Sequence, residues 1–454
     1  MKSKLLIISS LLLLASLICI YSCKHRRHQN DKLSGFTIAN RALAFKDHID
    51  TIPKGYKGPK FVLRKNYPIK VDSTLYKSEK EKCKWLNIPL TEKDFNSAVK
   101  KDNGQWPEKW DEYASSIKQY LVSNLKLEKN GIAFNNPYWY NLPWLATNPY
   151  SGREFTHGAR YSFPIPITQL VPSAKSKATV SVWGIAHYNY FGGLALGQVW
   201  SEYGDLQYMP APNGNRVKGL PFLDGTVIHK VNIIGHLGDY TPEHLKNAPS
   251  WELNIHKNAP GTGAKTYERT LQKAHILEMD VMVKDSRSPC GWVFCALVYN
   301  DDVPYEKPLW ERYEIMGIQF GMDPESFPAV PITESKPIHQ TLLKPISEKW
   351  TVGCYGRLVT FQGSTSQNCM GCHQTSYSVK GTPSRGFALL GGLGKESCDT
   401  TSYKTYPNYF KNWKFPSVYD GTPMFNTSKD SLVGYDFSLR LFDAVESYEE
   451  YKVQ

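Results

Sequence analysis

Several features that would assign this chain to a common class are absent from its 454 residues. Beyond Ile20 there is no second apolar run long enough to span a bilayer, and there is neither an internal repeat nor a low-complexity segment. No nucleophile elbow accompanies Ser151–Glu154 or Thr156-His157, so hydrolysis is not the expected chemistry. The two glycines of Asn258–Gly263 follow no strand-to-helix turn, which argues against a phosphate-binding loop.

Cysteine is also scarce, with nine residues, yet two of them lie in the most informative segment. Residues Cys369–His373 have the Cys-x-x-Cys-His pattern at which haem c is attached. Cys369 and Cys372 can each form a thioether with one haem vinyl group, and His373 then lies where its imidazole reaches the iron as the proximal ligand. No second Cys-x-x-Cys or His-x-x-x-His follows to complete a zinc site. The pattern predicts one covalent haem c; the alternative is an incidental cysteine pair beside a surface histidine.

The N-terminus predicts export. Lys2 and Lys4 precede an apolar run, Leu5–Ile20, which has the length of a signal peptide and is short for a membrane span. The run ends at Ile20–Cys23, which resembles the lipobox of bacterial lipoproteins. Residues 1–23 are therefore expected to form a signal peptide, with Cys23 as the lipidated residue. The basic stretch Lys24–Arg27 opposes translocation, and it leaves an uncleaved anchor with a cytoplasmic body as the alternative.

Haem c is normally attached outside the cytoplasmic membrane, so the motif favours a membrane-anchored lipoprotein on the periplasmic or cell-surface side. The formal net charge of +12 is spread along the chain and is not gathered in a tail. Nucleic acid is not an expected partner in that compartment. An anionic lipid surface or an acidic redox partner protein fits this charge, and so does a merely solvated basic surface.

Five cysteines remain when Cys19, Cys23 and the haem pair are set aside. Because this number is odd, at least one thiol is expected to stay free or to pair between chains. The five are Cys83, Cys290, Cys295, Cys354 and Cys398.

The distribution of residue types along the sequence predicts an α+β fold. Residues 24–130 read as a polar tether, Lys24 to about Ser34, followed by a helical region in which Trp106–Leu127 has apolar residues at helical spacing. Residues 131–215 form an aromatic-rich region of strands and loops. Residues 216–454 are expected to form the haem c domain, with an insertion and a C-terminal tail. Its β-branched, aromatic runs predict a mainly antiparallel sheet over Thr226–Ile234, His275–Lys284 and Gly291–Asn300.

The strand region carries a family resemblance in three ordered elements. Leu220–Lys230 resembles the Pro-x-x-Asp-Gly-Thr-x-x-x-Lys opening of the cytochrome P-460 family. Met282–Asp285, followed by Gly291–Phe294, is similar to that family's Met-Val-Lys-Asp and Gly-Trp-x-Phe element. The family then ends in Cys-x-x-Cys-His, and here Cys369–His373 follows the other two elements in the same order. More broadly, the sequence resembles larger, poorly characterised single-haem bacterial proteins that share the Gly-Arg-Leu segment Gly356–Leu358.

The resemblance implies a mainly antiparallel β-domain that holds one haem c with His373 as the proximal ligand and no strong protein ligand on the distal side. Family members with an additional lysine–haem crosslink oxidise hydroxylamine, whereas the related c′-β type binds nitric oxide and similar small ligands. By position, Lys230 would be the crosslinking residue, with Lys284 as the alternative. Either lysine could instead be an ordinary strand residue. The long spacing from Trp292 to Cys369 departs from the short family members and indicates an insertion.

The distal side of the haem decides between two functions. An open site would bind or turn over nitrogen oxides, hydroxylamine or peroxide, whereas a saturated six-coordinate haem would only transfer electrons to a redox partner. Met424, in a loop-like setting, is the candidate distal ligand for electron transfer, and a buried core methionine is the alternative. Glu278 is a candidate distal carboxylate for proton transfer. Other candidate distal ligands or acid/base groups are His236, His275 and His339.

Overall fold

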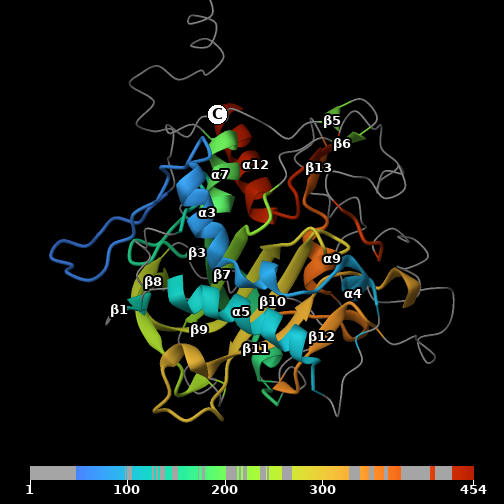
Figure 1. The fold of residues 1–454 in the computed structure, drawn as a ribbon. Helices are drawn as coiled ribbons and strands as arrows, with labels where there is room; N and C mark the ends of the chain where they lie inside the picture. The colour runs from blue at the N-terminus through green and yellow to red at the C-terminus, as the bar shows by residue number, and fades with distance from the viewer. Residues whose placement is uncertain are drawn as a thin grey trace, which may run out of the picture.

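A single eight-stranded sheet organises the described part of the chain (Figure 1). The computed structural model describes most residues between 48 and 453. Its longer gaps are 100–104, 133–138, 146–151, 201–211, 218–221, 236–241, 258–267, 327–337, 347–351, 362–366, 380–409 and 415–431. The strand order is β12-β11-β10-β9-β7-β4-β3, and β8 pairs with β9 beside this path. Every pairing in the sheet is antiparallel, and with the helices this confirms the predicted α+β class.

The three predicted strands are present with small changes of boundary. Thr226–Ile234 corresponds to β7 (Val227–Gly235), and Gly291–Asn300 corresponds to β10 (Trp292–Tyr299). His275–Lys284 is the C-terminal part of a longer strand, β9 (Arg269–Lys284), whose first residues are more exposed and more polar than the rest. The other strands of the sheet are β3 (Arg160–Pro166), β4 (Thr179–Tyr188), β8 (Ser250–His256), β11 (Tyr313–Gln319) and β12 (Thr341–Leu343).

The two faces of the sheet are chemically different. Ala186, Lys230 and Asp280 are direct cross-strand neighbours on β4, β7 and β9, so their side chains share one face. The next residues along these strands, His187 and His229 with Val281, occupy the opposite face. His187 and His229 are fully buried there with their rings stacked at a centroid distance of 6.0 Å.

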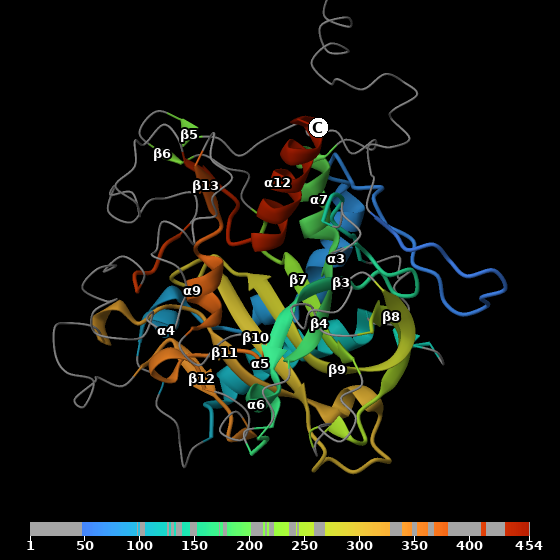
Figure 2. The ribbon, with the colours of Figure 1, turned by 180° about the vertical axis from the view of Figure 1, so that it is seen from behind.

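Helix α5 (Glu108–Asn124) covers the histidine face, as Figures 1 and 2 show from two sides. Its buried residues recur at helical spacing, which confirms the helix predicted over Trp106–Leu127. Trp110 stacks on Phe320 at 4.5 Å, and Tyr113 donates a hydrogen bond to Asp285. These contacts fix α5 against the end of the sheet at which β9 and β11 finish and β10 begins.

Two helices were not foreseen from the sequence. Helix α7 (Tyr190–Val199) lies in the aromatic-rich region, and all its residues except Gln198 are buried. It has no polar face, so the pattern of an amphipathic helix is missing. Helix α12 (Leu439–Val453), in the predicted tail, buries Leu441, Phe442 and Val445 against the body of the protein. Both helices lie on the same side of the molecule in Figure 1.

The sheet joins strands from the aromatic-rich region to strands from the predicted haem c domain, since β4 pairs with β7 over seven residues. Within the described ranges, no helix is long and apolar enough to cross a membrane. The smaller elements are α3 (Ser73–Lys82), α4 (Glu92–Asn96), α6 (Ile167–Leu170), α9 (Cys369–His373), β13 (Tyr377–Val379) and β14 (Leu432–Gly434).

Candidate haem-binding site

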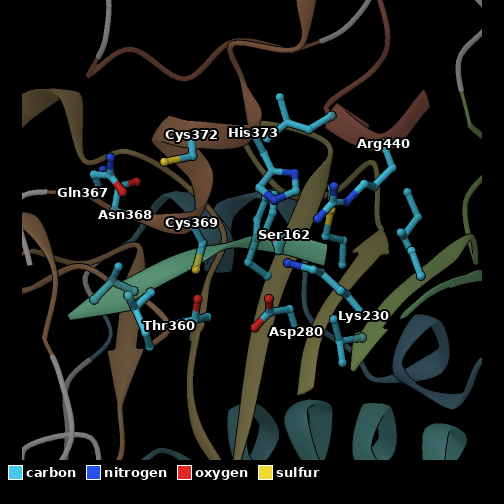
Figure 3. A pocket seen from close by; sticks show the side chains of 18 of the residues that line it. Ser162, Lys230, Asp280, Thr360, Gln367, Asn368, Cys369, Cys372, His373 and Arg440 are labelled. Carbon is cyan, nitrogen blue, oxygen red and sulfur yellow. The ribbon is translucent and has the colours of Figure 1, made fainter. Parts of the chain in front are cut away.

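A cavity of about 520 Å³ lies between the lysine face of the sheet and the helices α9 and α12 (Figure 3). Its volume is within the range of about 300–1,000 Å³ that is usual for small-molecule and cofactor sites. Most of the exposed lining surface is apolar, although many lining residues carry a polar or sulfur atom. The polar and sulfur-containing lining residues are Arg160, Ser162, Gln169, Lys230, Asp280, Met282, Cys295, Thr360, Gln367, Asn368, Cys369, Cys372, His373, Arg440 and Asp443.

The Cys-x-x-Cys-His motif forms the short helix α9 at the edge of this cavity. Asn368 caps the helix by accepting a hydrogen bond from the Gly371 amide at 2.7 Å. Gln319 at the end of β11 ties the cap to the sheet, because its Nε2 donates to Asn368 Oδ1 at 3.1 Å. Helical spacing places residues three and four apart on one side of the helix. Cys369, Cys372 and His373 therefore all line the cavity.

The two thiols have the properties of attachment sites more than of a redox pair. Both are free, so they do not form a disulfide with each other. Burial raises the pKa of Cys372 to about 12, and it also raises the pKa of Cys369 well above its usual value. Reactive dithiols and thiolate metal ligands need the opposite shift. The environment thus keeps both sulfurs as neutral thiols facing a cavity.

His373 has the orientation of an iron ligand. Its Nδ1 lies 2.9 Å from the backbone oxygen of Phe437. Because a carbonyl can only accept, Nδ1 carries the proton and donates it, and the lone pair of the neutral ring is on Nε2. Burial lowers the pKa of His373 to about 4, although the bond to Phe437 acts in the opposite direction. The ring is therefore neutral at physiological pH, as metal ligation requires.

The carbonyl that orients His373 belongs to an unusual turn between β14 and α12. Asp436 and Phe437 both have positive φ, 42° and 64°, a conformation that costs energy for residues other than glycine. The buried carboxylate of Asp436 fixes the turn. It accepts hydrogen bonds from Lys284 Nζ at 2.8 Å, from Trp292 Nε1 at 2.9 Å and from the Phe222 amide at 2.8 Å.

Lys230 points into the cavity from β7, near Asp280 on β9 (Figure 3). Burial lowers the pKa of Lys230 well below its usual value, and the nearby Arg440 lowers it further, whereas Asp280 opposes the shift. Burial raises the pKa of Asp280, which Lys230 partly offsets. Gly184 leaves room for the lysine, since a Cβ at that position would lie 2.8 Å from Lys230 Cε. The cavity therefore holds an amine that deprotonates more readily than an exposed lysine.

The other predicted site residues lie elsewhere. Lys284 does not line the cavity but forms the ion pair with Asp436. Glu278 is fully buried and accepts a hydrogen bond from the Phe361 amide at 2.6 Å and one from Asn232 at 3.1 Å. His275 is half-buried beside Ala248, and His339 is half-buried near Asp323; neither lines the cavity. The remaining candidates, Cys23, His236 and Met424, lie outside the described residues.

Four residues of this site were missed by sequence reasoning. Asp436 and Phe437 act through one carboxylate and one backbone carbonyl, which no spacing rule detects. Asp280 follows Glu278 by two residues on β9. Because side chains of a strand point alternately to its two faces, both lie on one face, and the sequence does not show which one reaches the cavity. Arg440 begins α12 in a region that was predicted only as a tail.

The remaining cysteines agree with the odd count. Cys83, Cys290 and Cys295 are free and buried, which confirms that at least one thiol remains unpaired. Cys354 is in a disulfide bond, and Cys398 lies outside the described residues. Over the described ranges, no group of three or more His, Cys, Asp or Glu side chains is arranged to hold a metal ion by itself.

In comparisons with known proteins, no family model, no curated protein and no solved structure matches this chain. The resemblance to the cytochrome P-460 family therefore stays a prediction. The site itself fits a haem c on three counts: two free thiols and one oriented, neutral imidazole face a common cavity of suitable size.

Proposed function

We propose that this chain is an exported c-type cytochrome with one haem attached through Cys369 and Cys372 and with His373 as the proximal iron ligand. The main support for the proposal is the hydrogen bond from His373 Nδ1 to the Phe437 carbonyl. This bond leaves the lone pair of Nε2 available for an iron ion, in a cavity that two free thiols also line. Such a second partner on the far ring nitrogen is typical of metal-ligating histidines.

The bound haem would supply one-electron redox chemistry and a coordination site for a small molecule such as a nitrogen oxide, hydroxylamine or peroxide. Lys230 and Asp280 are the groups of this chain best placed to hold or move a proton beside that ligand, because both line the cavity. Lys230, more than Lys284, is also the candidate for a crosslink to the haem edge, since the amine of Lys284 is engaged with Asp436.

Export as a membrane-anchored lipoprotein on the periplasmic or cell-surface side is part of the proposal. The disulfide bond of Cys354 supports it, because such bonds persist mainly in oxidising compartments. Replacing Cys23 with Ala should release the protein from membranes. Retention of the variant at the membrane would instead indicate an uncleaved anchor.

The decisive experiment is expression in a host with haem c maturation, followed by denaturing electrophoresis and haem staining. The native chain should retain haem through denaturation, whereas Cys369→Ala/Cys372→Ala should lose it. Cys290→Ala is the matched control, because that thiol is also free but is buried away from the cavity lining. A native chain that carries no covalent haem would refute the proposal.

Absorption spectra of the same material distinguish the possible haem chemistries. A strongly red-shifted ferrous Soret band that disappears in Lys230→Met would identify the lysine crosslink. An ordinary c-type spectrum that shifts with carbon monoxide would mean an open ligand-binding site. An ordinary spectrum that carbon monoxide does not change would mean a six-coordinate haem and electron transfer as the function.

A further inference from the structure

A charged group with no role in the function proposed above lies at the α12 end of the cavity and consists of Arg160, Arg440 and Asp443. Arg440 and Arg160 both contact the carboxylate of Asp443, with Nη1 to Oδ2 distances of 3.2 Å and 3.5 Å. The two arginine side chains are 21% and 17% exposed, so this end of the cavity borders solvent. A smaller cavity of about 10 Å³ shares Arg160, Lys230 and Arg440 with the main one.

The position of Arg440 relative to the motif is informative. Figure 3 shows Cys369 and Cys372 on one side of His373 and Arg440 on the other. In haem, the two vinyl groups are on one half of the macrocycle and the two propionates are on the opposite half. A haem joined to Cys369 and Cys372 above or below His373 must therefore direct its propionates toward the α12 end.

The charge of the lining fits such a group. Three basic side chains, Arg160, Lys230 and Arg440, and two carboxylates, Asp280 and Asp443, line the cavity, so the lining has an excess of one positive charge when all five are ionised. A ferric haem with both propionates ionised and a neutral histidine ligand carries one negative charge. An unpaired propionate at a half-buried site would be costly, and a guanidinium is the side chain that best matches a carboxylate.

We propose that Arg440, held in place by Asp443 and assisted by Arg160, is a carboxylate-binding site that anchors a haem propionate. This inference rests on the proposed function, because it requires the haem to be attached at α9. It adds a cofactor contact from the C-terminal helix, so that the haem links α9 to α12 across the cavity.

Resonance Raman spectroscopy of the matured native protein tests the inference, because the propionate bending modes report hydrogen bonding to the propionates. Arg440→Gln should shift a propionate mode to lower frequency and should also lower the midpoint potential, since a cation near the haem is lost. Arg312→Gln is the matched control: Arg312 is a buried arginine that bonds Tyr299 and does not line the cavity. Both readouts should match the native protein in this control.

A propionate mode that is unchanged in Arg440→Gln would overturn the inference, even if the potential shifts, because Arg440 would then act only as a nearby charge or bind a free carboxylate. Arg440→Met removes the donors while keeping a long side chain, and it provides a second variant if Arg440→Gln does not fold. It should shift the same mode in the same direction, and no shift would again contradict the inference. Absence of covalent haem from the native chain would be seen first, by haem staining, as a failure of the proposed function.

Discussion

At the scale of single residues, the orientation of His373 depends on side chains far away in the sequence. The Phe437 carbonyl that accepts its proton belongs to a turn with two positive φ angles. That turn is held by Asp436, whose partners are Lys284 and Trp292, about 150 residues earlier. All three of these side chains are almost completely buried. The resemblance motif around Met282–Phe294 therefore acts in the structure as a support for the turn that orients His373.

The Lys284–Asp436 pair gives a prediction about stability. Asp436→Asn leaves a buried ammonium without its counter-charge, and Lys284→Met leaves a buried carboxylate in the same condition. Each single variant should lose on the order of 3 kcal/mol of unfolding free energy in urea, because breaking one side of a buried pair is costly. The double variant should lose clearly less than the sum of the two, since no uncompensated charge remains.

An orientation readout separates this role from simple packing. In the matured protein, Asp436→Asn should shift the iron–histidine stretching frequency, because the Phe437 carbonyl moves relative to His373. Asp280→Asn is a control that changes a cavity carboxylate without touching this turn. Additive stability losses together with an unchanged stretching frequency would show that Asp436 does not position His373.

The sequence predicts a site residue well when that residue belongs to a short contiguous motif, and poorly when its role depends on contacts between distant segments. Cys369, Cys372 and His373 belong to a motif of five consecutive residues, so the sequence alone was sufficient to group them as one site, whereas the short helix α9 that carries them was not predicted. Lys230 was preferred over Lys284 by its position in the motif alone, because each lies within a strand-like run and only the three-dimensional pairing shows which amine faces the cavity. Asp436 was invisible, since its contribution depends on a turn conformation and on partners from other strands.

At the scale of elements, prediction succeeded where burial is one-sided or where a run is rich in β-branched residues. The strands β7, β9 and β10 and the helix α5 are of this kind. The helix α7 failed the same test because it is buried nearly all round. The helix α12 was not predicted, although its buried residues Leu441, Val445 and Tyr448 recur at helical spacing. The cavity is bounded by α12, so its shape could not be predicted either.

The close approach of β4 and β7 leads to a second prediction. In Gly184→Ala, the new Cβ would lie 2.8 Å from Lys230 Cε, and the flexible lysine can move away at little cost to the fold. The pKa of Lys230 should then rise toward its usual value, because burial is the main cause of its low value. An NMR titration of the ammonium group, with urea unfolding in parallel, measures both effects.

Gly235, on β7, provides the control for Gly184, which is on β4. At Gly235 an added Cβ would meet Ile255 Cδ1 at 3.0 Å, which is distant from the cavity residues. Gly235→Ala should therefore leave the titration of Lys230 as in the native chain. If Gly184→Ala also leaves it unchanged, the lysine does not occupy the space that Gly184 provides.

At the scale of the whole molecule, one sheet separates two different environments. The face under α9 and α12 is lined by cations, carboxylates and thiols around a cavity. The opposite face, under α5, is closed by aromatic rings: Trp139 lies 5.8 Å from His229 and 6.1 Å from His187 between ring centroids. Residues of the two faces alternate along β4, β7 and β9, so each cavity residue on these strands is next in sequence to a residue of the aromatic face.

The buried histidine pair predicts how stability depends on pH. Burial lowers the pKa of His229 to about 3 and lowers that of His187 well below its usual value. In the unfolded chain both residues titrate near pH 6.5. Below that pH the unfolded state binds more protons than the folded state, so stability is complete above about pH 6.5 and falls as the pH decreases. Each histidine should contribute a slope of about 1.4 kcal/mol per pH unit down to its folded pKa.

His229→Phe removes one of these titrations while keeping an aromatic ring against Trp139. Among the residues that the structure describes, neither ring nitrogen of His229 has a hydrogen-bond partner that the substitution would strand. The loss of unfolding free energy between pH 7 and pH 5.5 should therefore be smaller than in the native chain by about 1 kcal/mol. Val231→Ala, on the same strand and face, should lower stability equally at both pH values, because it titrates nothing. If His229→Phe keeps the native pH dependence, the histidine is hydrated or protonated in the folded state. Water would then reach the aromatic face, contrary to the structure.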